Sequence, residues 1–148
     1  MPTKNIFDLR IRTMTNQHHK EVAEIDQLTA FGEDLLCDEA MNGIPDNVKS
    51  RVIVDPEGSV LGFAMYFDGP TYAECNVVRF AVHPSTQRRG IGWKMMEYIK
   101  CSYHQIDVLV HDDRYEAMSF LSEQKFEVRQ VLKSAEAVLF RWIRKGAE

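Results

Sequence analysis

Cysteine is scarce in this sequence, and its spacing forms no recognisable framework. Cys37, Cys75 and Cys101 are the only three cysteines in 148 residues, and no C-x-x-C pair occurs. A disulfide-stapled secreted domain needs several cysteines, and a cysteine zinc site needs them in closely spaced pairs. The sequence therefore predicts reduced thiols, a cytoplasmic protein and no metal site.

Long apolar runs and an excess of positive charge are also absent. No run approaches the ~20 apolar residues of a membrane-spanning helix, and residues 1–12 lack the apolar core of a signal peptide. The net charge of −4 argues against general binding to nucleic acid or to anionic membranes. We expect one domain, residues 1–148, which is long enough to bury a proper core.

Apolar periodicity predicts an alternation of strands and helices along the whole chain. Residues 9–14 alternate as a half-buried strand does, and Val22, Ile25 and Leu28 then recur at helical spacing. The predicted order is β-α-α-β-β-β-α-β-α-β-β. The elements are strand 9–14, a helix between Thr15 and Gly32, helix 33–41, strands 51–54, 60–67 and 75–82, helix 93–103, strand 106–110, helix 116–124 and strands 126–131 and 137–143.

The run Gln87-Arg88-Arg89-Gly90-Ile91-Gly92 lies between the predicted strand 75–82 and the predicted helix 93–103. At such a turn, several backbone N–H groups point outward together at the positive end of a helix and form an anion site. Two glycines let the backbone approach a ligand closely, and the two arginines add charge-assisted bonds to phosphate oxygens. The alternative is a turn whose glycines serve only its own geometry.

The segment from Val82 to Gly92 resembles the acyl-CoA-binding motif of the GCN5-related N-acetyltransferases, the GNAT superfamily. The predicted order of elements is also that of the GNAT fold, so the resemblance covers nearly the whole chain. It implies an α/β (α+β) fold with a mixed, mostly antiparallel sheet of six to seven strands and about four flanking helices. It also implies a splay between the fourth and fifth strands that holds the pantetheine arm.

The resemblance implies which residues bind the co-substrate, acetyl-CoA. Main-chain groups at the end of the fourth strand would hold and polarise the thioester carbonyl, and the glycine turn would bind the pyrophosphate. These residues are Phe80, Ala81, Val82, Gln87, Arg88, Arg89, Gly90, Ile91, Gly92 and Trp93, together with Arg114, which replaces the asparagine that usually opens the last-helix segment of the family. An ordinary place on the flank of its helix is the alternative for Trp93.

The sequence departs from the family at the position of the general acid. The segment from Ala117 to Phe126 resembles the last helix of the family, but Leu121 stands where a tyrosine often protonates the leaving thiolate. Tyr115 is a substitute that lies about a turn and a half earlier. The resemblance therefore implies either Tyr115 as the acid or a reaction without a dedicated acid.

The position of the general base is altered as well. Leu109 stands where amino-terminal acetyltransferases of the family often carry a glutamate or histidine on the fifth strand. His111 points to the same side of that strand if the strand extends so far, and a neutral imidazole is a suitable base. Glu74 and Asn76, at the start of the fourth strand, are candidates for contact with the amine. A solvated surface position is the alternative for His111 and for Glu74.

The sequence gives little information about which amine is the acceptor. The stretch from Val22 to Phe31 resembles the corresponding helix of RimI-like ribosomal-protein-alanine acetyltransferases, but the Pro-Trp that commonly follows is replaced by Gly32-Glu33-Asp34. We predict an N-acetyltransferase that moves acetyl from acetyl-CoA to a protein or peptide amine by direct attack in a ternary complex. A small-molecule amine and a non-catalytic acyl-CoA-binding module remain alternatives, and a homodimer is left open.

Overall fold

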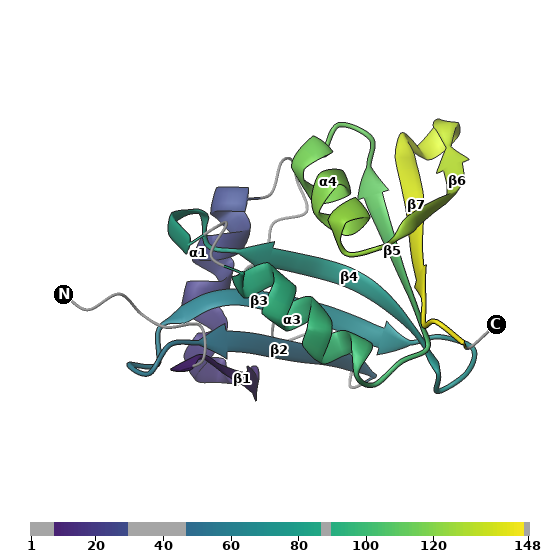
Figure 1. The fold of residues 1–148 in the computed structure, drawn as a ribbon. Helices are drawn as coiled ribbons and strands as arrows, with labels where there is room; N and C mark the ends of the chain where they lie inside the picture. Colours follow the sequence, from purple (N-terminus) through teal and green to yellow (C-terminus); the bar gives the residue numbers. More distant parts are fainter. Residues whose placement is uncertain (1–7, 30–46, 87–89, 147–148) are drawn as a thin grey trace. The chain divides into compact units, whose positions relative to one another are not determined.

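The computed structural model describes residues 8–29, 47–86 and 90–146 of the 148. The predicted helix 33–41 lies outside these residues. Three α-helices and seven strands are described (Figure 1). They are β1 Arg10–Thr13, α1 His19–Thr29, β2 Val48–Val54, β3 Val60–Asp68, β4 Glu74–Val82, α3 Ile91–Lys100, β5 Gln105–His111, α4 Tyr115–Glu123, β6 Glu127–Leu132 and β7 Ala137–Ile143.

The strands form one sheet in the order β1-β2-β3-β4-β5-β7-β6. β4 and β5 are parallel, whereas β1 pairs antiparallel with β2, and β7 pairs antiparallel with both β5 and β6. The predicted α/β fold with a mixed sheet is therefore confirmed, and most strand boundaries agree within two or three residues. None of the described helices is long and apolar enough to cross a membrane.

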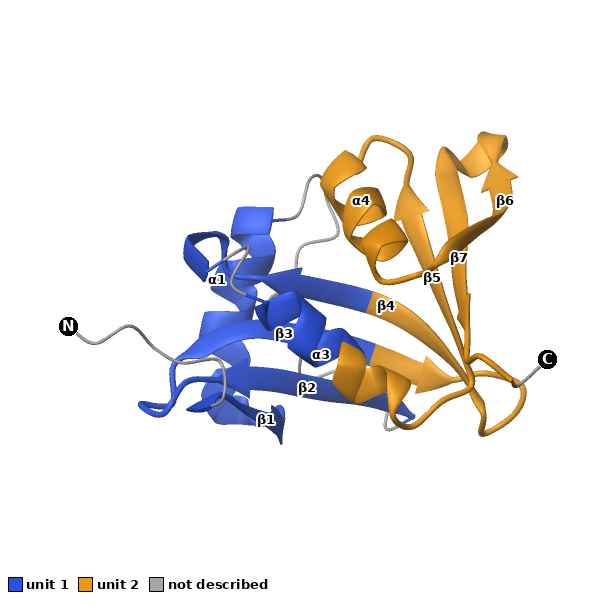
Figure 2. Ribbon diagram, in the orientation of Figure 1, with its two compact units in different colours: residues 1–65, 79–96 blue, residues 66–78, 97–148 orange. Residues whose placement is uncertain are grey.

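Two compact units share the chain (Figure 2). One comprises residues 1–65 and 79–96, and the other comprises residues 66–78 and 97–148. The elements β3, β4 and α3 each begin in one unit and end in the other. The expectation of one domain spanning residues 1–148 stays a prediction.

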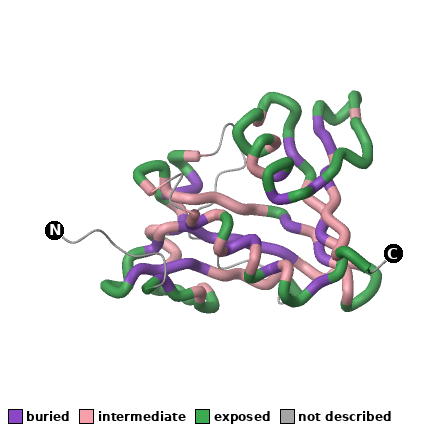
Figure 3. The backbone as a smooth tube through the Cα atoms, viewed as in Figure 1, coloured by how far each residue is buried: buried purple, intermediate pink, exposed green. Residues whose placement is uncertain are grey.

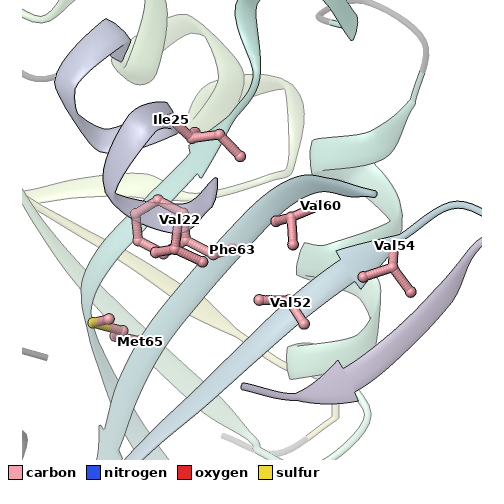
Figure 4. Close-up of a cluster of buried hydrophobic side chains, with 7 residues drawn as sticks. All are labelled: Val22, Ile25, Val52, Val54, Val60, Phe63 and Met65. Atoms are coloured by element: carbon pink, nitrogen blue, oxygen red, sulfur yellow. The ribbon is translucent and has the colours of Figure 1, made fainter. Parts of the chain in front are cut away.

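The core of the first unit forms where α1 packs against the sheet. Val22 and Ile25 lie on the side of α1 that faces the strands (Figure 4). Their buried partners are Val52 and Val54 of β2 and Val60, Phe63 and Met65 of β3. Most of β3 and the end of β2 are continuously buried, whereas no residue of β6 is buried (Figure 3).

The buried stripe of α1 differs from the prediction at one position. Leu28 is exposed, and Asp26 is buried with Val22 and Ile25. The reason is helical geometry: Asp26 follows Val22 by about one turn, whereas Leu28 follows it by about one and two-thirds turns and leaves the stripe. The third buried residue of α1 is therefore Asp26 and not Leu28.

In the second unit, several side chains contact the segment that follows α3. The ring of Tyr103 meets Tyr66 edge-on at a centroid distance of 6.1 Å, and its hydroxyl donates to Asp68 at 2.7 Å. Arg144 donates to the carbonyl oxygens of Lys100 and Tyr103 at 2.6 and 3.0 Å. These contacts explain why α3 ends at Lys100, three residues before the predicted end of the helix.

Candidate functional site

Strand β4 carries one more residue than the strand beside it. The amide of His83 donates to Leu61 at 2.8 Å, and the amide of Gly69 donates to the carbonyl of Glu74 at 2.8 Å. Between these two bonds, the segment with β3 runs from residue 61 to 69, and the segment with β4 runs from residue 74 to 83 and is one residue longer. Antiparallel pairing keeps the two strands in step, so the additional residue is a β-bulge in β4.

The parallel ladder between β4 and β5 is short. It pairs Glu74 to Val77 with Gln105 to Val108 and does not continue to the next position, Val78 and Leu109. These two apolar side chains are 52% and 56% exposed. The alternation of burial along β4 also ends at Val78, which indicates that the extra residue lies near this point.

A tight turn follows β4 and begins at His83. The Nδ1 atom of His83 accepts hydrogen bonds from the amide of Ser85 at 3.1 Å and from its hydroxyl at 2.7 Å. The amide and the hydroxyl of Thr86 both donate to the carbonyl of His83 at 2.9 Å. Because Nδ1 accepts, the proton of a neutral ring lies on Nε2. The turn leads directly into Gln87, Arg88 and Arg89, which lie outside the described residues.

The start of α3 has the backbone form of an anion site. Gly90 has φ +79°, a left-handed conformation that glycine adopts without steric cost. The amide of Lys94 donates to the carbonyl of Gly90 at 2.9 Å as the first helical bond. The amides of Ile91, Gly92 and Trp93 therefore belong to the helix terminus, where the helix provides no acceptor for them. Ile91 is buried and anchors this terminus, and Trp93 is exposed.

The candidates for proton transfer all lie in the second unit, whereas the described candidates for acetyl-CoA binding, Arg114 apart, lie in the first. Glu74 is the half-buried first residue of β4. His111 is the exposed last residue of β5, so the strand extends far enough to carry it, and its carbonyl accepts from the amide of Arg114 at 3.1 Å. Arg114 precedes α4, and Tyr115 is an exposed residue in its first turn.

The sequence matches the family model described as acetyltransferase (GNAT) domain over residues 48–128, which is more than half of the chain. This stretch contains the bulged β4, the His83 turn and the start of α3. The chain belongs to the GNAT acetyltransferase family. This family uses acetyl-CoA, and the predicted glycine turn at residues 87–92 lies within the matched stretch.

Solved structures show the same fold at low sequence identity. A GCN5-related N-acetyltransferase from Kribbella flavida has a TM-score of 0.76 at 17% identity, covering 94% of this chain and 99% of the other. The ribosomal-protein-S18-alanine N-acetyltransferase of Escherichia coli has a TM-score of 0.73 at 15% identity, covering 95% and 97%. A spermidine N-acetyltransferase chimera from Vibrio cholerae and hSSAT has a TM-score of 0.72 at 10% identity, covering 92% and 95%. No curated protein sequence matches the chain.

A polar row crosses strands β4, β5 and β7 of this GNAT protein, and the sequence analysis identified only its first member, Asn76. Asn76 of β4 is paired with Asp107 of β5, and Asp107 with Arg141 of β7. Arg141 donates to both carboxylate oxygens of Asp107, at 2.7 and 3.0 Å. The hydrogen bond that Arg141 donates to Asp107 raises the pKa of Arg141, and the charge of Glu74 adds to this shift. The sequence feature that could have indicated this row is the presence of Asp107 and Arg141 within otherwise apolar strands.

A second unpredicted pair joins α1 to β4. Arg79 Nη2 donates to Asp26 Oδ2 at 3.3 Å, and Arg79 Nε lies 3.2 Å from Asp26 Oδ1, within ion-pair distance but not oriented for a hydrogen bond. The side chains are 25% and 5% exposed. Among the described residues of this GNAT domain, no group of histidine, cysteine, aspartate or glutamate could hold a metal ion.

Proposed function

We propose that this protein transfers the acetyl group of acetyl-CoA to the primary amine of a protein or peptide, by direct attack in a ternary complex. The observation that carries the proposal is Gly90, which holds φ +79° immediately before the first turn of α3. Such a turn directs helix-terminal amides toward an anion, and it follows a bulged strand, as acetyl-CoA binding in the GNAT family requires.

We assign the binding roles of individual residues from the motif. Residues 87–93 bind the pyrophosphate, with Arg88 and Arg89 supplying charge-assisted hydrogen bonds. Main-chain groups of Phe80, Ala81 and Val82 hold the acyl-pantetheine and polarise the thioester carbonyl. Arg114 completes the set of groups for acetyl-CoA.

In the reaction, a neutral amine attacks the thioester carbonyl. A bond forms between nitrogen and carbon, the carbon–sulfur bond breaks, and coenzyme A leaves as a thiolate. The amine loses one proton, which His111 accepts directly or through water, with Glu74 contacting the amine. Tyr115 is the candidate donor to the thiolate. An α-amino group with a pKa of ~8 needs less assistance than a lysine side chain with a pKa of ~10.4, which favours a peptide N-terminus as the acceptor.

Small amines remain the second candidate class. One specific observation supports it: the S18-alanine and the spermidine acetyltransferases resemble this chain almost equally, with TM-scores of 0.73 and 0.72. A non-catalytic acyl-CoA-binding module is the remaining alternative, and Leu121 and Leu109 at the usual acid and base positions favour it.

The decisive experiment is acetylation followed by mass spectrometry. Acetyl-CoA is offered with peptides that have free N-termini, N-blocked lysine peptides, polyamines and aminoglycosides. Product on the free N-terminal peptides supports the proposal, and product only on small amines replaces the acceptor class. Binding of acetyl-CoA without product on any acceptor supports the non-catalytic module.

Two glycine variants test the binding turn. Gly90→Asp places a side chain and a negative charge at φ +79°, where phosphate would bind, and it should abolish the affinity for acetyl-CoA in calorimetry. Gly146→Asp introduces the same charge at another glycine with a positive φ of +89° and open space around it. It should leave the affinity unchanged. Equal affinity in both variants would remove the turn from the site.

A further inference from the structure

The ion pair between Asp26 and Arg79 occupies a place that packing alone would give to apolar side chains. Asp26 lies on the stripe of α1 that also buries Val22 and Ile25. Arg79 belongs to the apolar run Val77 to Val82 of β4. A buried ion pair is weak evidence for stability, because apolar residues of similar volume often serve equally well. The charges therefore call for a role other than holding the unit together.

The position of Arg79 suggests that role. The ladder to β5 ends at Val77, and the burial pattern of β4 changes at Val78, so Arg79 follows the irregular part of the strand. Phe80, Ala81 and Val82, the proposed main-chain contacts of the acyl group, come next. Ala81 also packs against the core cluster beneath α1. The side chain of Arg79 thus links β4 to α1 immediately before the segment that would contact acetyl-CoA.

An arginine–carboxylate pair provides direction, which apolar packing does not. The planar guanidinium presents its donors in a fixed fork, and both carboxylate oxygens of Asp26 lie within 3.3 Å of it. Burial at 5% exposure of Asp26 protects the pair from competition with water. One contact, from Nη2, is a hydrogen bond and the other, from Nε, is an ion-pair contact. Together they constrain the orientation of the Arg79 side chain more than the packing of a methionine or leucine would.

We propose that Asp26 and Arg79 are positioning residues that fix the bulged end of β4 for acetyl-CoA. The proposal rests on the proposed function, since it concerns the same binding segment. It assigns no chemical step to either side chain. It predicts that the pair is needed for affinity and turnover even when the fold is stable without it.

The test uses the double variant D26L/R79M, which replaces the ion pair by apolar side chains of similar size. Its Tm should stay within about 4 °C of the wild type or rise, because both charges of the pair are removed together and apolar side chains of similar volume take their place. Its affinity for acetyl-CoA in calorimetry should fall at least about tenfold, and kcat should fall with it, because a small misplacement of the binding groups is enough. R79K, which keeps the charge but lacks the fork, should show a smaller loss of affinity.

Glu21→Ala is the matched control. Glu21 is another polar link from α1 to the sheet, and its carboxylate accepts the amide of Val60 of β3 at 2.9 Å. This variant should lower the Tm and leave the affinity for acetyl-CoA unchanged. If D26L/R79M binds acetyl-CoA as well as the wild type, the positioning role is refuted while the proposed function stands. If the wild type itself does not bind acetyl-CoA, both proposals fail.

Discussion

A Cβ atom at Gly62 would lie 2.9 Å from the carbonyl oxygen of Ala81 and 3.5 Å from the Cα atom of Val82. Strand β3 therefore approaches β4 more closely at this point than a side chain permits. The obstructing atom is backbone and cannot rotate away as the end of a flexible side chain could. Glycine is thus required opposite the main chain that we propose holds the acyl group.

Gly62→Ala should affect both stability and binding. The added methyl group must displace the carbonyl of Ala81, and overpacking of this kind lowers the free energy of unfolding by about 1–3 kcal/mol. Because the displaced backbone belongs to the proposed acyl-binding segment, the affinity for acetyl-CoA should fall several-fold. Urea denaturation and calorimetry measure the two effects.

Gly58→Ala is the control for this prediction. Gly58 has φ +88° with no other atom near its Cβ position, and it lies in the turn between β2 and β3. Alanine should lower the free energy of unfolding by about 1–2 kcal/mol through backbone strain without changing the affinity for acetyl-CoA. If Gly62→Ala leaves the affinity as unchanged as Gly58→Ala does, the close approach has no bearing on binding.

Features that depend on neighbouring residues were predictable from the sequence. The turn at residues 55–58, which joins the predicted strands 51–54 and 60–67, is one example: the carboxylate of Asp55 accepts from the amides of Glu57 and Ser59, each at 2.9 Å. This side-chain contact with the following backbone is the reason aspartate favours turns. The strands and helices were predicted for the same reason, since their periodicity is local, and the glycine turn was found through a short motif.

Features that depend on distant residues were not predictable in this way. Asp26 and Arg79 are 53 positions apart, and Asp107 and Arg141 are 34 positions apart. A single sequence does not indicate which charged residues become partners. The bulge in β4 is a property of its pairing with β3, so nothing within β4 alone reveals it. Leu28 is a case where a local pattern misleads: apolar periodicity predicts that it is buried, but it lies beside the buried stripe of α1 and is exposed.

The turn after β4 makes its own prediction. His83→Ala removes the acceptor of two hydrogen bonds from Ser85, and the loss of a comparable helix-capping contact costs about 1 kcal/mol. Because residues 84–86 lead into the proposed pyrophosphate segment, we also expect a several-fold weaker affinity for acetyl-CoA. His83→Asn should retain most of the affinity, because its side-chain oxygen can accept the amide two residues on. Equal losses in both variants would contradict this role for His83.

The partly buried position of Lys100 leads us to predict that the stability of the fold depends on pH. Its Nζ atom lies 5.1 Å from the ring centroid of Trp142 and donates to the carbonyl of Gln124 at 2.8 Å. Burial lowers the pKa of Lys100 from its ordinary value of 10.5, and Glu97, at 3.6 Å, partly opposes the shift. Between the folded-state pKa and 10.5, the unfolded chain binds more protons, so this contribution to stability increases with pH.

The measurement is the free energy of unfolding of the wild type and of Lys100→Met at several pH values. The difference, wild type minus variant, should increase as the pH rises through the folded-state pKa toward 10.5. Glu97→Gln should lower the pKa of Lys100 further, because the variant removes the charge that raises it; NMR titration of Nζ would detect this. A difference that stays constant or declines over this pH range would refute the expectation.

The candidate base provides the last prediction. His111→Ala should reduce kcat about 100-fold or more, the range expected for loss of a general base, with little change in the affinity for acetyl-CoA. Because His111 is exposed at the end of β5, imidazole added to the solution should restore part of the activity. Glu74→Gln should act mainly on KM for the amine, since its proposed part is contact with the acceptor. Wild-type kcat in His111→Ala would exclude His111 as the base and leave transfer to an amine that is already neutral.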